Sequence, residues 1–501
     1  MPVRKLPVPF APFISTNGAP PDILTGRTHR QHPVKMAPQI PCASIAADLF
    51  APQGAAATMK HILVVLLCLI QCALNASAAP STPQQPSSDS YLQLSAQVDS
   101  ALHSDILGVW FPRSIDNING GFHSHFARDW RELPSDGKFS VFQGRMTWVA
   151  AQVVLREPAM KDQFIPIVHH GVDFLTSNMW DEHDGGFFWG VDDSGKITPE
   201  FGENKHLYGI GFCIYGLAAA YKATADPKAL EFSKKGFLWI NEHAHDKTHG
   251  GYYEWLQRDG TPVIPNAPNG TVLTNSIGPI NYKSMNTHIH LLEAFTELYR
   301  VWPDPTLRSR LEELLSIVRD TICVEPGVMN LYFTNAWQPI PDHDSYGHDV
   351  ETAYLMLETD ELLHHKASEQ TERMARMLVD HALAYGWDTK NGGFFREGTT
   401  FGKAEDTMKE WWIQMEGLNA LLMMHERYGD HDPRYFQRFT EQWNFIRNHT
   451  FDAKYHGDFN VTTADGTPVT EDKGSIWKAA YHDSRALWNV RDRLQKLAET
   501  H

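Results

Sequence analysis

Asp184-Gly185-Gly186-Phe187-Phe188 is the clearest copy of a short stretch that recurs along the chain and decides its fold. In related stretches the second glycine falls at 121, 186, 251 and 393, and Asp458 takes its place in a fifth copy. Three of the four intervals are 65 residues and one is 142, which predicts a further loop near Pro326-Gly327. Glycine supplies the positive φ that tight turns need. The period predicts six units between residues 90 and 498, each with two helices and a hairpin loop.

The segments between these loops are predicted to be helical. Residues 289–302, 350–363 and 418–428 place apolar side chains on one broad face, without the alternation of a strand. Stacked repeats must end in caps or close on themselves. Polar residues are spread unevenly among the repeats, as expected where several units share one central site. We therefore predict an all-α fold, an (α/α)6 barrel of six helix hairpins in a closed toroid. An open solenoid of helix pairs is the alternative.

The composition restricts the function. A formal net charge of −16 argues against a surface for nucleic acid or for an anionic membrane. The chain has 15 Trp, 16 Tyr and 26 Phe, and a minority of these rings lining a cleft would suit stacking on sugar faces. After residue 78 only Cys213 and Cys323 remain, and both are predicted to be buried free thiols.

The N-terminal region divides by composition. Residues 59–78 have a short polar start, an apolar run and a small-residue cleavage site, which is the layout of a secretory signal peptide. Residues 1–58 are a disordered extension or the product of a start codon assigned too early, with translation beginning at Met59. A linker is predicted at 79–90 and the barrel at 91–498. We expect a periplasmic or secreted protein without a membrane segment in its mature form, with a cytoplasmic location as the alternative.

Three stretches place histidine among polar, aromatic and acidic residues: 286–290, 345–351 and 477–485. Histidine has an ordinary pKa of about 6.5, so it suits proton transfer near neutral pH. His288 and His290 point about 200° apart on a helix and cannot chelate one ion. No zinc-type cysteine spacing or phosphate-cradling glycine loop is present. We predict proton-transfer chemistry on an uncharged substrate, with no cofactor and no metal.

Four segments carry a resemblance to a known family: SMNTHIHLLEAF at 284–295, SYGHDVE at 345–351, KEWWIQMEG at 409–417 and WKAAYHDSR at 477–485. They resemble the signature segments of the N-acylglucosamine 2-epimerase superfamily, closest to its cellobiose 2-epimerase branch. The resemblance covers nearly all of 90–498. It implies an (α/α)6 barrel that epimerises or isomerises the reducing end of a sugar without metal or nucleotide chemistry.

The resemblance also implies roles for individual residues. Inverting C2 of an aldose requires ring opening, removal of the C2 proton to give an enediolate, and return of a proton on the other face. His348 and His482 match the family's acid/base pair, His290 matches a residue that helps hold the enediolate oxygen, and Arg145 matches an arginine that donates to the open-chain oxygens. The predicted substrate-binding residues are Tyr208, Asn286, Glu351, Trp412, Glu416 and Trp477.

Helical spacing supports part of this assignment. His348 opens an apolar helix, whose N-terminus disfavours an imidazolium, and Asp349 and Glu351 are placed to orient its ring. Asn286, His290 and Glu293 are spaced i, i+4 and i+7, which makes a polar stripe on an apolar helix. Trp477 and Tyr481 are four residues apart and are predicted to share a helix face that His482 borders.

The predicted activity is epimerisation of glucose to mannose at the reducing end of a β-1,4-linked disaccharide of the cellobiose type. N-acylglucosamine 2-epimerase and aldose–ketose (mannose) isomerase are alternatives. A glycoside hydrolase on the same toroid would use two carboxyl groups, with Glu293, Glu351 and Glu416 as candidates. A non-catalytic sugar-binding protein would not need His348 and His482 together. The expected partner is a sugar alone, and we expect a monomer.

Overall fold

The computed structural model describes residues 86–135, 137–198, 201–263, 282–400 and 402–500, and the backbone of 274–275 and 278–279. The predicted extension, the signal peptide and most of the predicted linker lie outside these residues. The linker was predicted to reach residue 90, but the first described helix already begins at Ser88. Within the described residues, no helix has both the length and the apolar character needed to cross a membrane.

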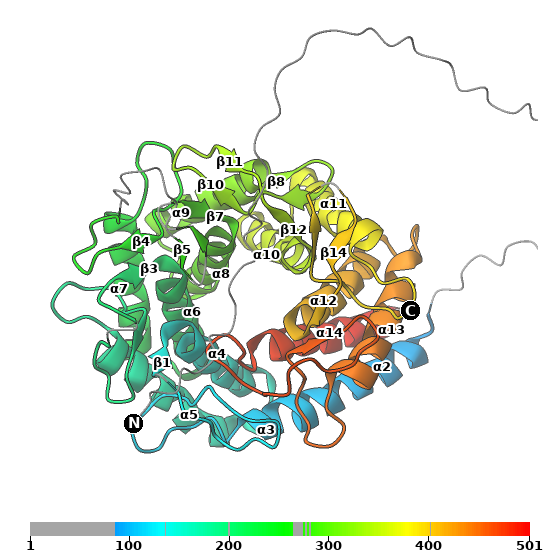
Figure 1. The fold of residues 1–501 in the computed structure, drawn as a ribbon, viewed down its shortest axis with the longest axis horizontal. Coiled ribbons are helices and arrows are strands. Elements are labelled where there is room, and N and C mark those ends of the chain that lie inside the picture. The colour runs from blue at the N-terminus through cyan, green and yellow to red at the C-terminus, as the bar shows by residue number, and fades with distance from the viewer. Residues whose placement is uncertain are drawn as a thin grey trace, which may run out of the picture. The chain divides into compact units, whose positions relative to one another are not determined.

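In the unit Pro83–His501, the described residues form a closed ring of six inner helices (Figure 1). Each inner helix contacts the next one along the chain, and the last contacts the first. The predicted toroid is therefore confirmed, and the open solenoid is wrong. The inner helices are α4 (Ser140–Arg156), α6 (Leu207–Thr224), α8 (Met285–Val301), α10 (Tyr346–His364), α12 (Trp411–Tyr428) and α14 (Tyr481–Thr500).

Six outer helices cover the ring, and each packs mainly against one inner helix. In the order of the inner helices α14, α4, α6, α8, α10 and α12, the partners are α2 (Ser88–Ala101), α5 (Lys161–Phe174), α7 (Pro227–His243), α9 (Pro305–Ile317), α11 (Glu369–Tyr385) and α13 (Arg434–Phe445). π-Helical turns extend four of them: η2 (Leu102–Leu107), η3 (Leu175–Met179), η4 (Val318–Ile322) and η5 (Ile446–Thr450), and α3 (Gly108–Trp110) follows η2.

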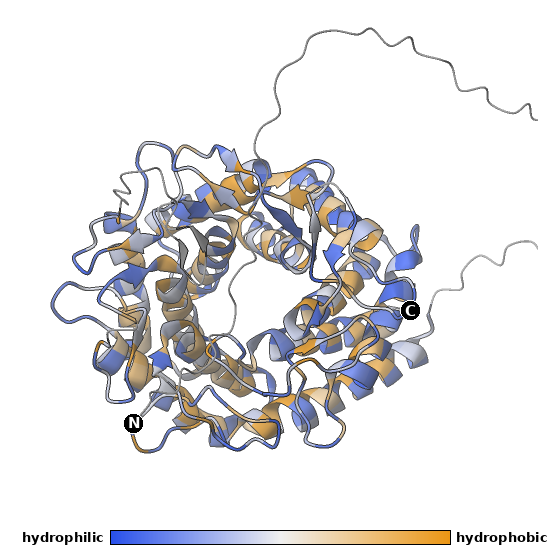
Figure 2. Cartoon of the chain, viewed as in Figure 1, coloured by the Kyte–Doolittle hydropathy of each residue, from blue (hydrophilic) through white to orange (hydrophobic). Residues whose placement is uncertain are grey.

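The two layers differ in side-chain pattern because they differ in burial. Helix α6 is buried along nearly its whole length, whereas α13 buries one stripe and exposes the rest. Figure 2 shows α4 and α6 mainly in the colours of apolar residues, while α13 alternates. Outer helices also have local start signals: the Asp226 carboxylate accepts from the Lys228 amide, and Pro227 follows at the first helical position.

Long loops lead into the inner helices, and short turns leave them. The strand before an inner helix pairs antiparallel with the loop of the next unit, and a bridge between Phe126 and Gly474 joins the first loop to the last. The strands are β1 (Lys138–Phe139), β2 (Gly190–Val191), β3 (Lys205–His206), β4 (Trp255–Leu256), β5 (Thr274–Asn275), β6 (Gly278–Pro279), β7 (Lys283–Ser284), β8 (Cys323–Val324), β9 (Val328–Met329), β10 (Tyr332–Phe333), β11 (Pro339–Ile340), β12 (His343–Ser345), β13 (Glu397–Thr399), β14 (Ala404–Asp406), β15 (Lys409–Glu410) and β16 (Val461–Thr462).

The repeated glycine loops are confirmed as tight turns closed by single bridges, such as Trp180 to Phe187. Gly185 and Gly186 have φ of 70° and 73°, where a Cβ would be strained. The predicted fourth loop is the hairpin β8–β9, and it lies around Gly327 as expected. One alignment was wrong by one residue: Asp458 forms the bridge, so Gly457, with φ of 67°, is the equivalent of the second glycine.

A lysine fastens each loop in five units, counted over the described residues. We number the units by the inner helix that follows each loop, so the loop before α12 belongs to unit five. There Lys409 Nζ is 2.9 Å from a carboxylate oxygen of Asp388 and donates to the Gly392 carbonyl at 2.6 Å. Asp388 in turn accepts amide hydrogen bonds from its own loop. We call each such pair a Lys–Asp anchor. The other anchors are Lys138–Asp116, Lys205–Asp181, Lys283–Asp246 and Lys473–Asp452.

Candidate active site

The predicted site residues gather at one end of the barrel. Trp477 lies in the loop four residues before the start of α14. The others lie in the first two turns of an inner helix: Arg145 in α4, Tyr208 in α6, Asn286 and His290 in α8, His348 and Glu351 in α10, Trp412 and Glu416 in α12, and His482 in α14. Helix N-termini carry a partial positive charge. Six of them around one site therefore favour an anion there and disfavour a cation.

Two histidines pack against one tryptophan. The ring centroids of His348 and Trp412 are 4.8 Å apart, and those of His482 and Trp412 are 5.6 Å apart. His348 and Trp412 are partly exposed, whereas His482 is buried. The two imidazoles predicted to exchange protons with the substrate are thus brought together from α10 and α14.

The two imidazoles have different partners. Glu416 Oε1 lies 2.8 Å from His482 Nδ1, so the ring donates from Nδ1 to the carboxylate and keeps Nε2 as a base. His348 Nδ1 lies 2.7 Å from the Ser345 hydroxyl. Burial lowers the pKa of His348 to about 4 and holds the pKa of His482 well below 6.5. Both rings are therefore neutral, and able to accept a proton, near pH 7.

The polar stripe on α8 is confirmed. His290 Nδ1 is 2.9 Å from Glu293 Oε2, and the His290 ring lies 5.1 Å from that of Tyr208. Within the described residues, the buried amide oxygen of Asn286, one turn earlier, makes no hydrogen bond. The stripe thus presents one imidazole held by a carboxylate and one amide with free capacity to bind a sugar hydroxyl.

Arg145 connects α4 to two other predicted residues. Its guanidinium donates to the Tyr208 hydroxyl and to the Trp477 carbonyl, both at 3.1 Å. It also lies over the Phe212 ring at 4.3 Å. Arg145 is buried, and its charge is available to an oxygen of a bound ligand.

Sequence reasoning missed Arg485, which lies at the centre of the cluster. Its guanidinium donates to Glu293, Glu351 and Glu416, with a distance of 2.6 Å to Glu416. Burial alone would raise the pKa of Glu293, but Arg485 lowers it to about 2. Arg485 is within one helical turn of His482 in WKAAYHDSR, a spacing that signals a shared neighbourhood. We call Arg485 with these three glutamates the Arg485 cluster.

Two local predictions were wrong. Helix α14 begins at Tyr481, so Trp477 lies in the preceding loop and shares no helix face with Tyr481. The Asp349 side chain does not orient His348. Its Oδ2 faces His381 Nδ1 at 3.8 Å, and Ser345 contacts His348 instead. The first error arises because spacing does not show where a helix starts, and the second because neighbours in a helix point in different directions.

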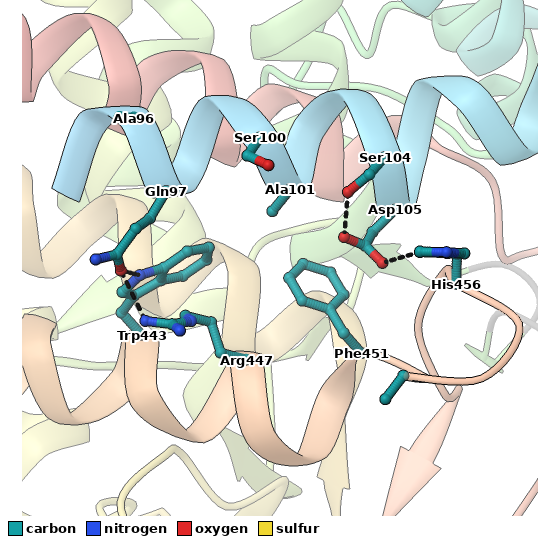
Figure 3. Close-up of a pocket in the computed structure, with 11 residues that line it drawn as sticks. Ala96, Gln97, Ser100, Ala101, Ser104, Asp105, Trp443, Arg447, Phe451 and His456 are labelled. Atoms are coloured by element: carbon teal, nitrogen blue, oxygen red, sulfur yellow. Dashed lines mark hydrogen bonds and ion pairs between the residues drawn. The ribbon is translucent and has the colours of Figure 1, made fainter. Parts of the chain in front are cut away.

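A group of possible metal ligands and a cavity on the outside of the ring are two further candidate sites. Glu351, Glu416 and His482 are close enough to hold a metal, but both carboxylates already accept from the Arg485 guanidinium. A cavity of about 480 Å³ lies outside the ring between α2 and α13 (Figure 3). There Gln97 Oε1 accepts from Arg447 at 2.7 Å, and Asp105 faces His456 at 3.0 Å, so its polar groups are already paired.

Comparison with known proteins places this arrangement in context. The profile of the family described as N-acylglucosamine 2-epimerase matches residues 120–486. A cellobiose 2-epimerase of Bacteroides fragilis is 28% identical over 396 residues, covering 78% of this chain and 97% of that protein. A D-mannose isomerase of Marinomonas mediterranea is 22% identical, covering 81% of this chain and 98% of that protein. The solved cellobiose 2-epimerase of Spirochaeta thermophila superposes with a TM-score of 0.73 at 30% identity, covering 83% of this chain and all of that one.

Proposed function

The chain belongs to the N-acylglucosamine 2-epimerase family, and on that premise we propose that it epimerises C2 of the reducing-end aldose of a β-1,4-linked disaccharide. Several relatives of similar sequence carry the name cellobiose 2-epimerase, which supports a glucose-to-mannose conversion on cellobiose. The observation that carries the proposal is the pair of neutral imidazoles, His348 and His482, packed against Trp412 at the helix N-termini.

The two proton transfers of the proposed reaction each have a candidate imidazole. Once the ring is open, the C1 carbonyl acidifies the C2 proton, and a neutral imidazole accepts that proton. Rotation about C2–C3 presents the other face of the enediolate. The second imidazole, which has taken up a proton from solvent, returns that proton and becomes neutral, while the first imidazolium releases its proton to solvent. The carboxylate of Glu416 behind His482 stabilises the imidazolium that forms during the step. In the reverse direction the two histidines exchange roles.

The enediolate oxygen needs preorganised donors. His290 and Arg145 are buried beside Tyr208, and both hold fixed positions through hydrogen bonds. The positive ends of the surrounding inner helices add to their field. Groups that are already oriented toward the developing charge lower the barrier without reorganising during the reaction. Trp412 and Trp477, both partly exposed, offer ring faces for the apolar sides of the two sugars.

Product analysis tests the proposal directly. Mature protein without added metal or nucleotide is incubated with cellobiose, lactose, mannose or N-acetylglucosamine, and the products are identified by NMR. We expect glucosyl-mannose from cellobiose. Free glucose would indicate a hydrolase. Reaction with mannose or N-acetylglucosamine, and not with cellobiose, would replace the disaccharide epimerase with one of the other activities found in this family.

The same reaction in D2O tests the enediolate. Removal and return of the C2 proton through imidazoles that exchange with solvent places deuterium at C2 of the product mannose unit. A product that keeps its original C2 hydrogen after a single turnover would contradict proton transfer by the histidine pair, even if epimerisation is observed.

We also propose that the protein acts outside the cytoplasm, because residues 59–78 have the layout of a secretory signal peptide. Expression of the full chain in a bacterial host, followed by N-terminal sequencing of the periplasmic fraction, tests this. A mature N-terminus near Ala79 is expected. An uncleaved chain that remains in the cytoplasm would contradict it.

A further inference from the structure

Unit four departs from the other five at the loop before its inner helix. In four of the anchors the lysine stands two residues before the inner helix, as Lys409 does before Trp411. In unit four that position is Asp344, two residues before Tyr346. In the other units the anchor aspartate directly follows the residue that closes the loop with a bridge. In this unit Cys323 pairs with Met329, so Val324 stands at the position of the aspartate. At the position of the anchor lysine, this loop therefore has a carboxylate where the others have an ammonium group.

Asp344 meets two further ionisable side chains. His381 Nδ1 lies 3.4 Å from Asp344 Oδ2 and 3.8 Å from Asp349 Oδ2. Asp344 and Asp349 are 0% exposed and His381 is 4% exposed. The three come from different elements, namely β12, α10 and α11. The two carboxyl groups contact each other. Among the described residues, no other group forms a hydrogen bond with them or with either ring nitrogen of His381.

This arrangement leaves charge to be balanced. Two neighbouring buried carboxylates cannot both stay ionised without a compensating cation. Among the described residues, neither Asp344 nor Asp349 forms an ion pair with a lysine or an arginine, and His381 is the one basic side chain within 4 Å of them. Either protons or a metal ion must fill the role that lysine has in the other units.

The spacing and the donor set favour a metal ion. Two ligands at about 2.1 Å from a tetrahedral cation are separated by about 3.4 Å, close to the two separations seen here. All three ligand atoms lie within 4.8 Å of one another. One imidazole and two carboxylates suit Zn²⁺ or Mn²⁺ better than Mg²⁺ or Ca²⁺, which prefer oxygen ligands alone.

We propose that Asp344, Asp349 and His381 bind one divalent cation of the zinc or manganese class. The ion replaces the lysine of a Lys–Asp anchor and ties the strand before α10 to helices α10 and α11. Its role is structural: it fixes the start of the helix that carries His348, because Asp349 faces His381 on the outer helix α11. This inference does not depend on the proposed epimerase activity.

Metal binding by the wild-type protein is measured first. The full mature protein is stripped with a chelator, dialysed, and titrated with Zn²⁺ and Mn²⁺ by calorimetry, with metal content checked by mass spectrometry. We expect one tight site per chain and a thermal unfolding midpoint that rises by at least about 3 °C when metal is restored. The proposal is overturned, in favour of protonated carboxyl groups, if the protein binds neither ion and its thermal unfolding midpoint is the same with metal and with chelator.

Variants locate the site. Asp344→Asn and His381→Gln should each weaken binding by at least about tenfold and remove the thermal response to metal. Asp388→Asn removes an ordinary anchor, so it should lower the midpoint yet leave metal affinity unchanged. Asp99→Asn changes the partly exposed Asp99, His103 and Glu157 group and controls for surface binding. Wild-type affinity in Asp344→Asn, or its loss in Asp99→Asn, would contradict the assignment.

Discussion

The Lys–Asp anchors and the Arg485 cluster lie at the same end of the barrel, and both bury charged side chains. An anchor sets one ammonium against one carboxylate and adds a backbone carbonyl. The Arg485 cluster sets one guanidinium against three carboxylates. The first arrangement is balanced and recurs around the ring. The second has surplus negative charge beside His290 and His482, and in the proposed mechanism that charge would stabilise the imidazolium.

Replacing a histidine of the site should have the largest effect. His482→Phe and His348→Phe keep a ring of similar shape but remove the proton carrier, so each should lower kcat at least about 1,000-fold. Initial rates of product formation on cellobiose measure this. Sugar affinity by calorimetry and the thermal midpoint should stay close to wild type. Undiminished turnover in either variant would remove that histidine from the mechanism.

Arg485→Met tests the Arg485 cluster as a structural unit. It leaves three buried carboxylates without their cation, and we expect the free energy of unfolding to fall by about 3 to 5 kcal/mol. Denaturant unfolding followed by circular dichroism measures this. Arg434→Met is the matched control, because Arg434 is exposed and its ion pairs are worth about 0.5 kcal/mol or less. Equal losses in the two variants would contradict a special role for the cluster.

The fold could be predicted from the sequence because its signal is local and repeated. A glycine with positive φ leaves the same mark in each loop, and even the loop without the double glycine was expected near Gly327. The sixth loop misled the alignment because His456 adopts the left-handed conformation that a glycine has elsewhere. A histidine at that position carries no signal in the sequence.

The site was only partly predictable. His290 and Glu293 could be paired because they share one helix turn. Arg485 could not be recognised, because the glutamates that make it a buried hub come from α8, α10 and α12, far away in the sequence. The exchange of lysine for Asp344 was missed for the same reason, since its partner His381 lies in another unit. Contacts that depend on ring closure leave no local pattern.

An ordinary anchor should matter less than the Arg485 cluster. Lys409→Met removes the cation that pairs with Asp388, but the carboxylate keeps its amide donors. We therefore expect the free energy of unfolding to fall by about 2 to 3 kcal/mol. Lys228→Met, at an exposed ion pair, is the control. kcat on cellobiose at 25 °C should be unchanged, because the anchor does not touch the site. A loss of activity with unchanged stability would contradict this separation.

The dependence of stability on pH tests the same anchor through its carboxylate, Asp388. Although burial raises the pKa of Asp388, Lys409 and Asn391 lower it below its ordinary value. A carboxyl group whose pKa is depressed on folding contributes stability above its unfolded pKa of about 3.9 and loses it as the pH falls through the folded pKa. Unfolding free energies measured from pH 5 to pH 2 should therefore fall less steeply in Lys409→Met than in the wild type.

The smallest expected effects come from the residues that hold the two proposed catalytic histidines. His348 is held by the neutral hydroxyl of Ser345, whereas His482 is held by the carboxylate of Glu416. A neutral hydrogen bond is worth about 1 kcal/mol, so Ser345→Ala should lower kcat about fivefold and leave KM unchanged. Glu416→Gln removes a charge that stabilises the imidazolium and should lower kcat by more. If the two substitutions have equal effects, the surplus negative charge of the Arg485 cluster does not assist proton transfer.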